Sequence, residues 1–226
     1  MSTHFDQELA LLKETLLTMA SHANSAVNNA IKALVERDDD LARSVIENDN
    51  VLDQLEIEID DMGIALLAKA PLARDLRLIT MTMKISHDLE RVGDEATTIA
   101  RRSIELSQEP QLKPYVDIPR MARMGLEMLN DSLDAFVNHD PAKARAVVPR
   151  DKEVDAIHKQ LQRELASYMI EKPTTITRCL HLMTISKCLE RIADHAANFS
   201  EDVVYLYDAE DIRHTAGKAQ TPATEA

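Results

Sequence analysis

The chain has 226 residues, and its 39 aspartates and glutamates outnumber its 26 lysines and arginines, which gives a formal net charge of −13. This balance argues against a nucleic-acid-binding protein, which would need a basic surface, and against adsorption to an anionic membrane. No uncharged apolar run approaches the roughly 18 residues of a transmembrane helix. The first residues also lack the basic and apolar regions of a secretory signal.

The composition predicts an all-α protein with long helices. The chain has only 4 Gly and 8 Pro, so residues that interrupt helices are rare. Aromatic residues make up 3% and Trp is absent, so the core is expected to be aliphatic. Cys179 and Cys188 fall on opposite faces of a helix, so we expect no disulfide between them and a reducing, cytoplasmic environment.

Apolar residues recur at helical spacing along the first half of the chain. Residues 6–36 are predicted to form one long helix. An acidic break at residues 37–40 carries a helix N-cap, and a second helix is expected from there to about Ala68. Pro71 separates it from a third helix, which is predicted to run from about Leu72 to Ser107.

The second half follows the same plan after a connector at residues 108–119, which contains three prolines. A fourth helix is expected at about 119–138 and a fifth from Pro141 to about Glu171, with Pro149 kinking it or splitting off its first turn. A sixth helix is predicted from about Thr175 to Tyr207. The polar segment 214–226 is predicted to be disordered.

This restart is an internal repeat. Residues 81–100 align with 181–200, and eight of the twenty positions are identical. Residues 34–53 align with 136–155, and seven of the twenty are identical. We therefore predict two three-helix bundles in tandem, six long helices in all, with a first unit at 1–109, a second at 117–209 and a disordered tail at 210–226.

Four acidic pairs have the i, i+4 spacing that places both carboxylates on one helix face. They are Asp49/Asp53, Glu90/Asp94, Asp151/Asp155 and Glu190/Asp194. In an antiparallel hairpin, residues whose numbers have a constant sum lie at the same height. Opposed members of the first two pairs sum to 143 and those of the last two to 345, so each unit is expected to collect four carboxylates on two adjacent helices.

Four neighbouring carboxylates repel one another unless a cation lies between them, and oxygen ligands suit Mg²⁺, Mn²⁺, Ca²⁺ or iron. The quartets are therefore predicted to be metal sites. Glu56 and His87 are peripheral candidates in the first, and His158 and His195 in the second, where Lys187 weakens the site. The alternative is a solvent-exposed face with ion pairs along each helix.

The sequence contains no glycine-rich phosphate loop and no nucleophile–base motif, so we expect a non-enzymatic protein. Two other classes remain open. A di-iron carboxylate enzyme or iron-storage bundle would use Glu-x-x-His motifs, and this chain offers only Asp155-x-x-His158. A purely structural helical dimer without metal is the third.

Residues 88–96 and 189–196 resemble the paired acidic signatures of the PhoU family of bacterial phosphate-signalling proteins, and residues 71–79 are similar to that family's segment entering its third helix. The resemblance spans about residues 5–208 and implies two tandem three-helix bundles. It also implies a homodimer and multinuclear clusters of Fe, Mn, Mg, Ca or Zn on the acidic surface, held at the eight positions of the four pairs. Cys188 and Ala193 depart from the first repeat and make the second site the weaker one.

The resemblance also implies a function. Members repress the phosphate-starvation response when phosphate is plentiful and restrain phosphate uptake. They are expected to link the ATPase subunit of the phosphate ABC transporter to a membrane sensor histidine kinase. The implied location is the cytoplasm, in peripheral contact with these membrane partners.

Overall fold

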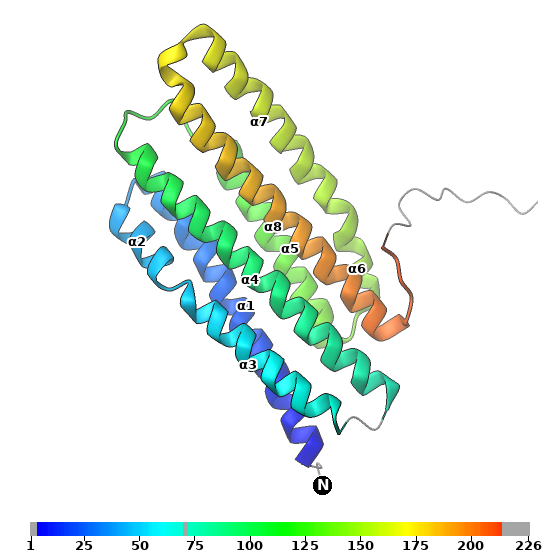
Figure 1. Ribbon diagram of the computed structural model, residues 1–226. Coiled ribbons are helices and arrows are strands. Elements are labelled where there is room, and N and C mark those ends of the chain that lie inside the picture. Colours follow the sequence, from blue (N-terminus) through cyan, green and yellow to red (C-terminus); the bar gives the residue numbers. More distant parts are fainter. Residues whose placement is uncertain (1–3, 70–71, 214–226) are drawn as a thin grey trace, which may run out of the picture.

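The computed structural model describes residues 4–69 and 72–213, and all regular elements within them are helices (Figure 1). The predicted all-α fold with two three-helix repeats is confirmed. The segment 214–226, predicted to be disordered, lies outside the described residues. None of the described helices is long and apolar enough to cross a membrane.

The first repeat contains α1 (His4–Glu36), α2 (Asp39–Glu47), α3 (Asn50–Leu67) and α4 (Ala73–Ser107). The prediction of one continuous second helix was wrong, because the helix is broken between α2 and α3. The Asn48 side chain donates a hydrogen bond to the Ser44 carbonyl, at 2.7 Å, and the Asn48 amide donates to the same carbonyl at 3.1 Å, so this residue caps the end of α2. The amides of Val51 and Leu52 then donate to the carbonyls three residues earlier, which tightens the turn that positions Asp49.

The second repeat contains α5 (Asp117–Asn138), α6 (Pro141–Val147), η1 (Val148–Arg150), α7 (Asp151–Glu171), η2 (Pro173–Thr175) and α8 (Ile176–Asp208). The predicted interruption at Pro149 is confirmed, because this residue lies in the 3₁₀ turn η1. The connector is shorter than predicted, because α5 begins at Asp117 and accommodates Pro119 in its first turn, where the missing amide is tolerated.

The two repeats share a corner at matching positions. Arg37 and His139 each have a left-handed backbone, with φ of 59° and 56°. The next residue in each case caps a helix: Asp38 accepts hydrogen bonds from the amides of residues 40 and 41, and Asp140 from that of residue 143, all at 2.9–3.1 Å. The sequence repeat therefore extends to the backbone and its caps.

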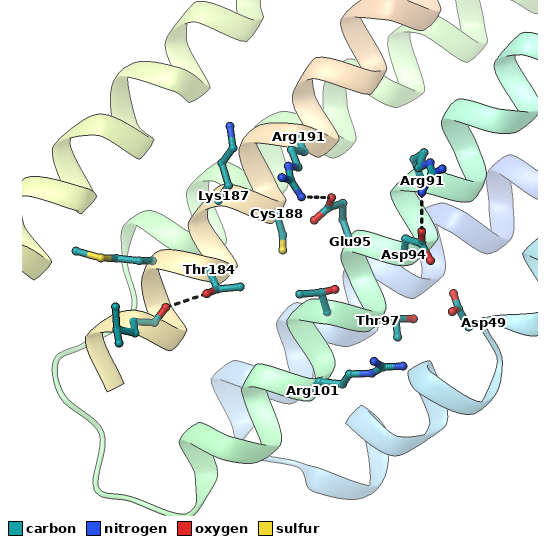
Figure 2. A pocket seen from close by; sticks show the side chains of 13 residues that line it. Asp49, Arg91, Asp94, Glu95, Thr97, Arg101, Thr184, Lys187, Cys188 and Arg191 are labelled. Carbon is teal, nitrogen blue, oxygen red and sulfur yellow. Dashed lines mark hydrogen bonds and ion pairs between the residues drawn. The ribbon is translucent and has the colours of Figure 1, made fainter. Parts of the chain in front are cut away.

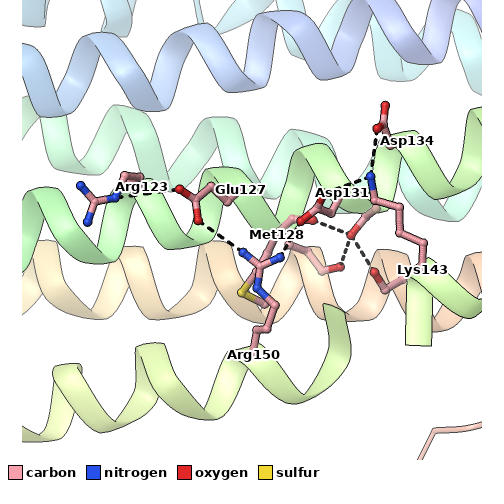
Figure 3. Close-up of polar contacts among 10 residues, drawn as sticks. Arg123, Glu127, Met128, Asp131, Asp134, Lys143 and Arg150 are labelled. Atoms are coloured by element: carbon pink, nitrogen blue, oxygen red, sulfur yellow. Dashed lines mark hydrogen bonds and ion pairs between the residues drawn. The ribbon is translucent and has the colours of Figure 1, made fainter. Parts of the chain in front are cut away.

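A network of ion pairs holds α6 and η1 against α5 (Figure 3). Lys143 bridges Asp131 and Asp134 at 3.1 and 2.9 Å, and Arg150 bridges Asp131 and Glu127. The network fixes the start of α7, where two of the predicted metal ligands lie.

The repeats meet where α4 and α8 run antiparallel through the middle of the molecule (Figure 1). Ion pairs cross this contact at regular intervals: Lys84–Asp202 at 2.6 Å, Glu95–Arg191 at 3.0 Å and Glu105–His181 at 3.1 Å. The core beneath is aliphatic apart from Phe136 and Phe199, whose rings pack edge to face. The division into units 1–109 and 117–209 stays a prediction.

Candidate metal centre on the acidic face

The first acidic cluster forms where the start of α3 lies beside α4. Asp49 immediately precedes α3, Asp53 lies in its first turn, and Glu90 and Asp94 lie on the facing side of α4. Burial raises the pKa of Asp49 and of Glu90, and the neighbouring charge of Asp94 raises both further. These shifts mean that the carboxylates are close enough to repel one another.

Glu56, His87 and Glu90 form the tightest set of metal-ligand atoms in this cluster. One ligand atom from each lies within 4.8 Å of the others, and His87 Nδ1 is 3.0 Å from Glu56 Oε1. Glu90 Oε2 is shielded from solvent and accepts no hydrogen bond from the described residues; Arg91 Nε is 3.5 Å away. Two carboxylates and one imidazole suit Mn²⁺, iron or Zn²⁺.

The second cluster joins Asp151 and Asp155 at the start of α7 to Glu190 and Asp194 on α8. Burial, and then the charges of the other three residues, raise the pKa of Asp151 to about 6. Two of its carboxylates already have cationic partners, because Lys159 pairs with Asp155 and Lys187 with Glu190. A metal ion would have to displace these lysines, just as one at the first cluster would have to displace Arg91 from Glu90 and Asp94.

The two histidines predicted at the edge of the second cluster hydrogen-bond elsewhere. His158 Nδ1 is 2.8 Å from Ser186 Oγ. His195 Nδ1 is 2.9 Å from Asp88 Oδ1 on α4, so this histidine belongs to the contact between the repeats. Glu56 and His87, by contrast, are brought together with Glu90.

Asp60 is a neighbour of the first cluster that the sequence analysis missed. Burial raises its pKa, and Glu56 and Asp61 raise it further. Glu56 and Asp60 have the same i, i+4 spacing as the four predicted pairs, so the signal was present in the sequence.

A cavity of about 700 Å³ extends from the first cluster across α4 to α8 (Figure 2). Two ion pairs lie in its lining: Arg91 with Asp94 at 3.3 Å, and Arg191 with Glu95 at 3.0 Å. Cys188 also lines it, but burial raises the pKa of this thiol far above its usual value. A protonated thiol in this setting is a poor nucleophile.

Packing explains why the repeats differ at Gly93 and Ala193. A β-carbon at Gly93 would overlap Cδ1 of Leu52, a buried residue next to Asp53. The repeat alignment places Val154 at the position of Leu52, and Ala193 and Val154 are both fully buried. In the second repeat, the smaller Val154 on α7 thus makes room for Ala193 on α8, where the first repeat pairs Leu52 with Gly93.

We expect Gly93→Ala to destabilise the protein by about 1–3 kcal/mol, because Leu52 must leave its packed position. The double variant Gly93→Ala with Leu52→Val is expected to recover most of that loss, although Leu52→Val alone costs about 1 kcal/mol. Urea denaturation of the four proteins measures the coupling. A double variant less stable than Gly93→Ala would contradict this account.

The ligand placement does not favour a di-iron enzyme. Those proteins project Glu-x-x-His motifs into the interior of a four-helix bundle. Here His87 is exposed, Glu56 and Glu90 are half-buried on the outer face of α3 and α4, and His158 is hydrogen-bonded to Ser186.

Comparison with known proteins identifies the family to which this architecture belongs. The PhoU domain family matches the chain twice, at residues 16–103 and 118–203. A phosphate-specific transport system accessory protein PhoU homolog of Pseudomonas putida is 41% identical over 222 residues, covering 97% of this chain and 87% of the relative. The crystal structure of PhoU from Pseudomonas aeruginosa has a TM-score of 0.89 at 39% identity, covering 92% of this chain and 100% of that one. The crystal structure of the phosphate transport system regulatory protein PhoU from Streptococcus pneumoniae has a TM-score of 0.86 at 30% identity, covering 92% and 99%.

Proposed function

Because this chain belongs to the PhoU family, we propose that it is a regulatory accessory protein of the phosphate transport system and not an enzyme. The observation that carries the proposal is the match of both repeats over nearly the full chain to proteins of that description. The paired acidic signatures at residues 88–96 and 189–196 support it from the sequence.

The finer proposal concerns its partners. The protein contacts the ATPase subunit of the phosphate ABC transporter and the sensor histidine kinase of the phosphate response, and so represses the starvation response and restrains uptake when phosphate is plentiful. It acts in the cytoplasm, as a homodimer in peripheral contact with these membrane proteins. The family resemblance supports this scheme.

The acidic clusters are proposed to hold multinuclear metal clusters. The first would use Asp49, Asp53, Glu90 and Asp94, with Glu56 and His87 beside them, and the second Asp151, Asp155, Glu190 and Asp194. Burial raises the pKa of Asp49, Glu90 and Asp151, and bound cations would remove the repulsion between carboxylates that raises it further. They would also stiffen the α3–α4 and α7–α8 faces that partners can contact.

Deleting the gene is expected to derepress alkaline phosphatase and phosphate uptake in phosphate-rich medium. The physical reason is that the kinase and transporter lose the protein that reports sufficiency to them. A phosphatase reporter and uptake of labelled phosphate measure the two effects. A complementing copy of the wild-type gene should restore repression, and unchanged reporter activity in the deletion strain would count against the proposal.

A further inference from the structure

A second cavity, of about 470 Å³, lies far from the acidic clusters. It forms where the starts of α1 and α4 meet the ends of α5 and α8, so both repeats contribute to it. Its lining includes Lys13, Arg74, Arg77, His139 and Tyr207. Arg74 and Arg77 belong to the segment 71–79, which resembles the PhoU family's entry into its third helix and lies outside both acidic clusters.

The charge of this cavity is opposite to that of the whole chain. Lys13, Arg74 and Arg77 line it, and the one carboxylate that the described residues contribute, Asp75, lies beside Arg74, with Nε of that arginine 3.5 Å from Oδ1. The chain as a whole carries a net charge of −13. The cavity therefore concentrates positive charge on a protein that is otherwise acidic, and an anion is attracted there.

Two of these cations lack partners among residues 4–69 and 72–213. Arg77 Nε is shielded from solvent and donates no hydrogen bond to any of these residues. Lys13 is partly buried, burial lowers its pKa, and none of the ion pairs among the described residues includes it. Arg102 and Arg178 also have a shielded Nε without a hydrogen bond, but their guanidinium groups form ion pairs with Glu105 and Glu109. A shielded donor without an acceptor lowers the stability of the folded protein. A bound ligand that supplies the acceptor removes this loss, so such a donor is expected at a ligand site.

We propose that this cavity binds a phosphoryl oxyanion, either as inorganic phosphate or as the phosphate group of a small phosphorylated metabolite. A guanidinium fork and an ammonium group are the side chains that suit phosphate oxygens. The cavity opens at the first turns of α4, a 35-residue helix whose positive end adds to the attraction.

The volume of the cavity leaves room beyond the phosphate itself. The His139 ring packs against the Tyr207 ring at one side, with the ring centroids 4.6 Å apart and the planes tilted by 35°, and His139 is exposed, so this pair offers an aromatic surface. The Tyr207 hydroxyl donates to the Phe136 carbonyl at 2.7 Å, so this ring is held in place and its hydroxyl is already used. A flat group such as a nucleobase can stack on this surface while its phosphate meets Lys13 and Arg77.

The inference does not depend on the proposed regulatory role. Ligand binding is measured on the purified chain, whereas the regulatory role is measured in cells. A protein that binds phosphate but does not repress the response would refute only the latter.

The test is isothermal titration of the full-length protein with inorganic phosphate and, separately, with AMP. The protein is first treated with a chelator, because a metal ion on the acidic face would itself attract phosphate. We expect saturable binding of at least one ligand. Tighter binding of AMP would identify a phosphorylated metabolite as the source, and equal or tighter binding of phosphate would identify the free anion. Absence of saturable binding of both would overturn the proposal.

Two matched pairs of variants locate the site. Lys13→Met and Arg77→Gln are each expected to weaken binding about tenfold or more, because each removes a charge-assisted hydrogen bond. Lys32→Met on α1 and Arg163→Gln on α7 make the same charge changes at exposed positions outside the cavity and should leave the affinity unchanged. Equal affinity in all four variants would place binding elsewhere and overturn the assignment.

The melting temperature of the ligand-free variants separates a binding role from a structural one. A ligand site holds Lys13 without a partner, so Lys13→Met should melt at the same or a higher temperature than the wild type when no anion is present. The variant should also lose the stabilisation that saturating phosphate or AMP gives to the wild type. A lower melting temperature together with undiminished stabilisation by the anion would show a structural lysine and contradict the proposal.

Discussion

Adding Mn²⁺ to the chelator-treated protein is expected to raise its melting temperature by roughly 5–10 °C. The carboxylates of the first cluster repel one another, as the raised pKa values of Asp49 and Glu90 indicate, and a bound cation removes that repulsion. A ligand present at about 100 times its dissociation constant stabilises the folded state by about 2.7 kcal/mol. For a chain of this size each kcal/mol corresponds to about 2–4 °C. Scanning calorimetry with Mn²⁺, Mg²⁺, Ca²⁺, Zn²⁺ and Fe²⁺ measures the shift.

Variants distinguish the two clusters. Glu90→Gln with Asp94→Asn should remove most of the metal-induced shift and slightly raise the melting temperature without metal, because repulsion falls. Glu190→Gln with Asp194→Asn should remove less, because Lys187 already neutralises part of that cluster.

Two exposed acids outside both clusters provide the matched control. Glu14→Gln with Glu171→Gln changes the net charge by the same amount and should leave the metal response unchanged. If the wild-type melting temperature is insensitive to every cation, the acidic clusters are solvent-exposed faces and the metal proposal is refuted.

Lys84→Met is expected to destabilise the protein by about 2 kcal/mol at pH 8. Asp202 is buried, with a side chain only 3% exposed, and it forms an ion pair with Lys84 of the other repeat at 2.6 Å. Removing one partner of such a pair leaves an uncompensated buried charge, which typically costs about 3–5 kcal/mol. We expect a smaller loss here because the Lys84 side chain is 40% exposed.

The loss should depend on pH in a defined direction. Burial raises the pKa of Asp202 to about 6 in spite of Lys84, so stability associated with this carboxyl is present at low pH and is lost as pH rises through about 6. Without Lys84 the pKa rises further. Lys84→Met should therefore cost little at pH 5, where Asp202 is protonated in both proteins, and most at pH 8.

The double variant Lys84→Met with Asp202→Asn is the control, because it leaves no unpaired charge. It should be more stable than Lys84→Met at pH 8, and its difference from that variant should disappear at pH 5. Urea denaturation at the two pH values measures both. A pH-independent loss in Lys84→Met would show that packing of the lysine stem, rather than charge, is responsible.

Much of the fold follows from local signals in the sequence. Proline positions and helical periodicity predicted all six helices and the split at Pro149, because both act through the backbone of neighbouring residues. The break between α2 and α3 escaped this reasoning. There the Asn48 side chain and amide both donate to the Ser44 carbonyl at the end of α2, a local cap that helix propensity does not reveal.

The candidate metal site shows the same division. Helical spacing and a constant sum of residue numbers were enough to assemble Asp49, Glu90 and Asp94, because an antiparallel hairpin has a fixed rise per residue. They did not predict that His195 turns away to Asp88 on α4, since that contact depends on how the second repeat docks against the first.

The sequence by itself determined the helices, the tandem repeat and the acidic faces, since each depends on residues close together in the chain. The tertiary structure decided which charged groups are satisfied. Lys84 pairs with Asp202 across the repeat interface, whereas Lys13 and Arg77 line one cavity and form no ion pair with the described residues, since the carboxylate there, Asp75, lies beside Arg74. Pairing of side chains from helices far apart in sequence depends on the packing of those helices, which no local pattern specifies.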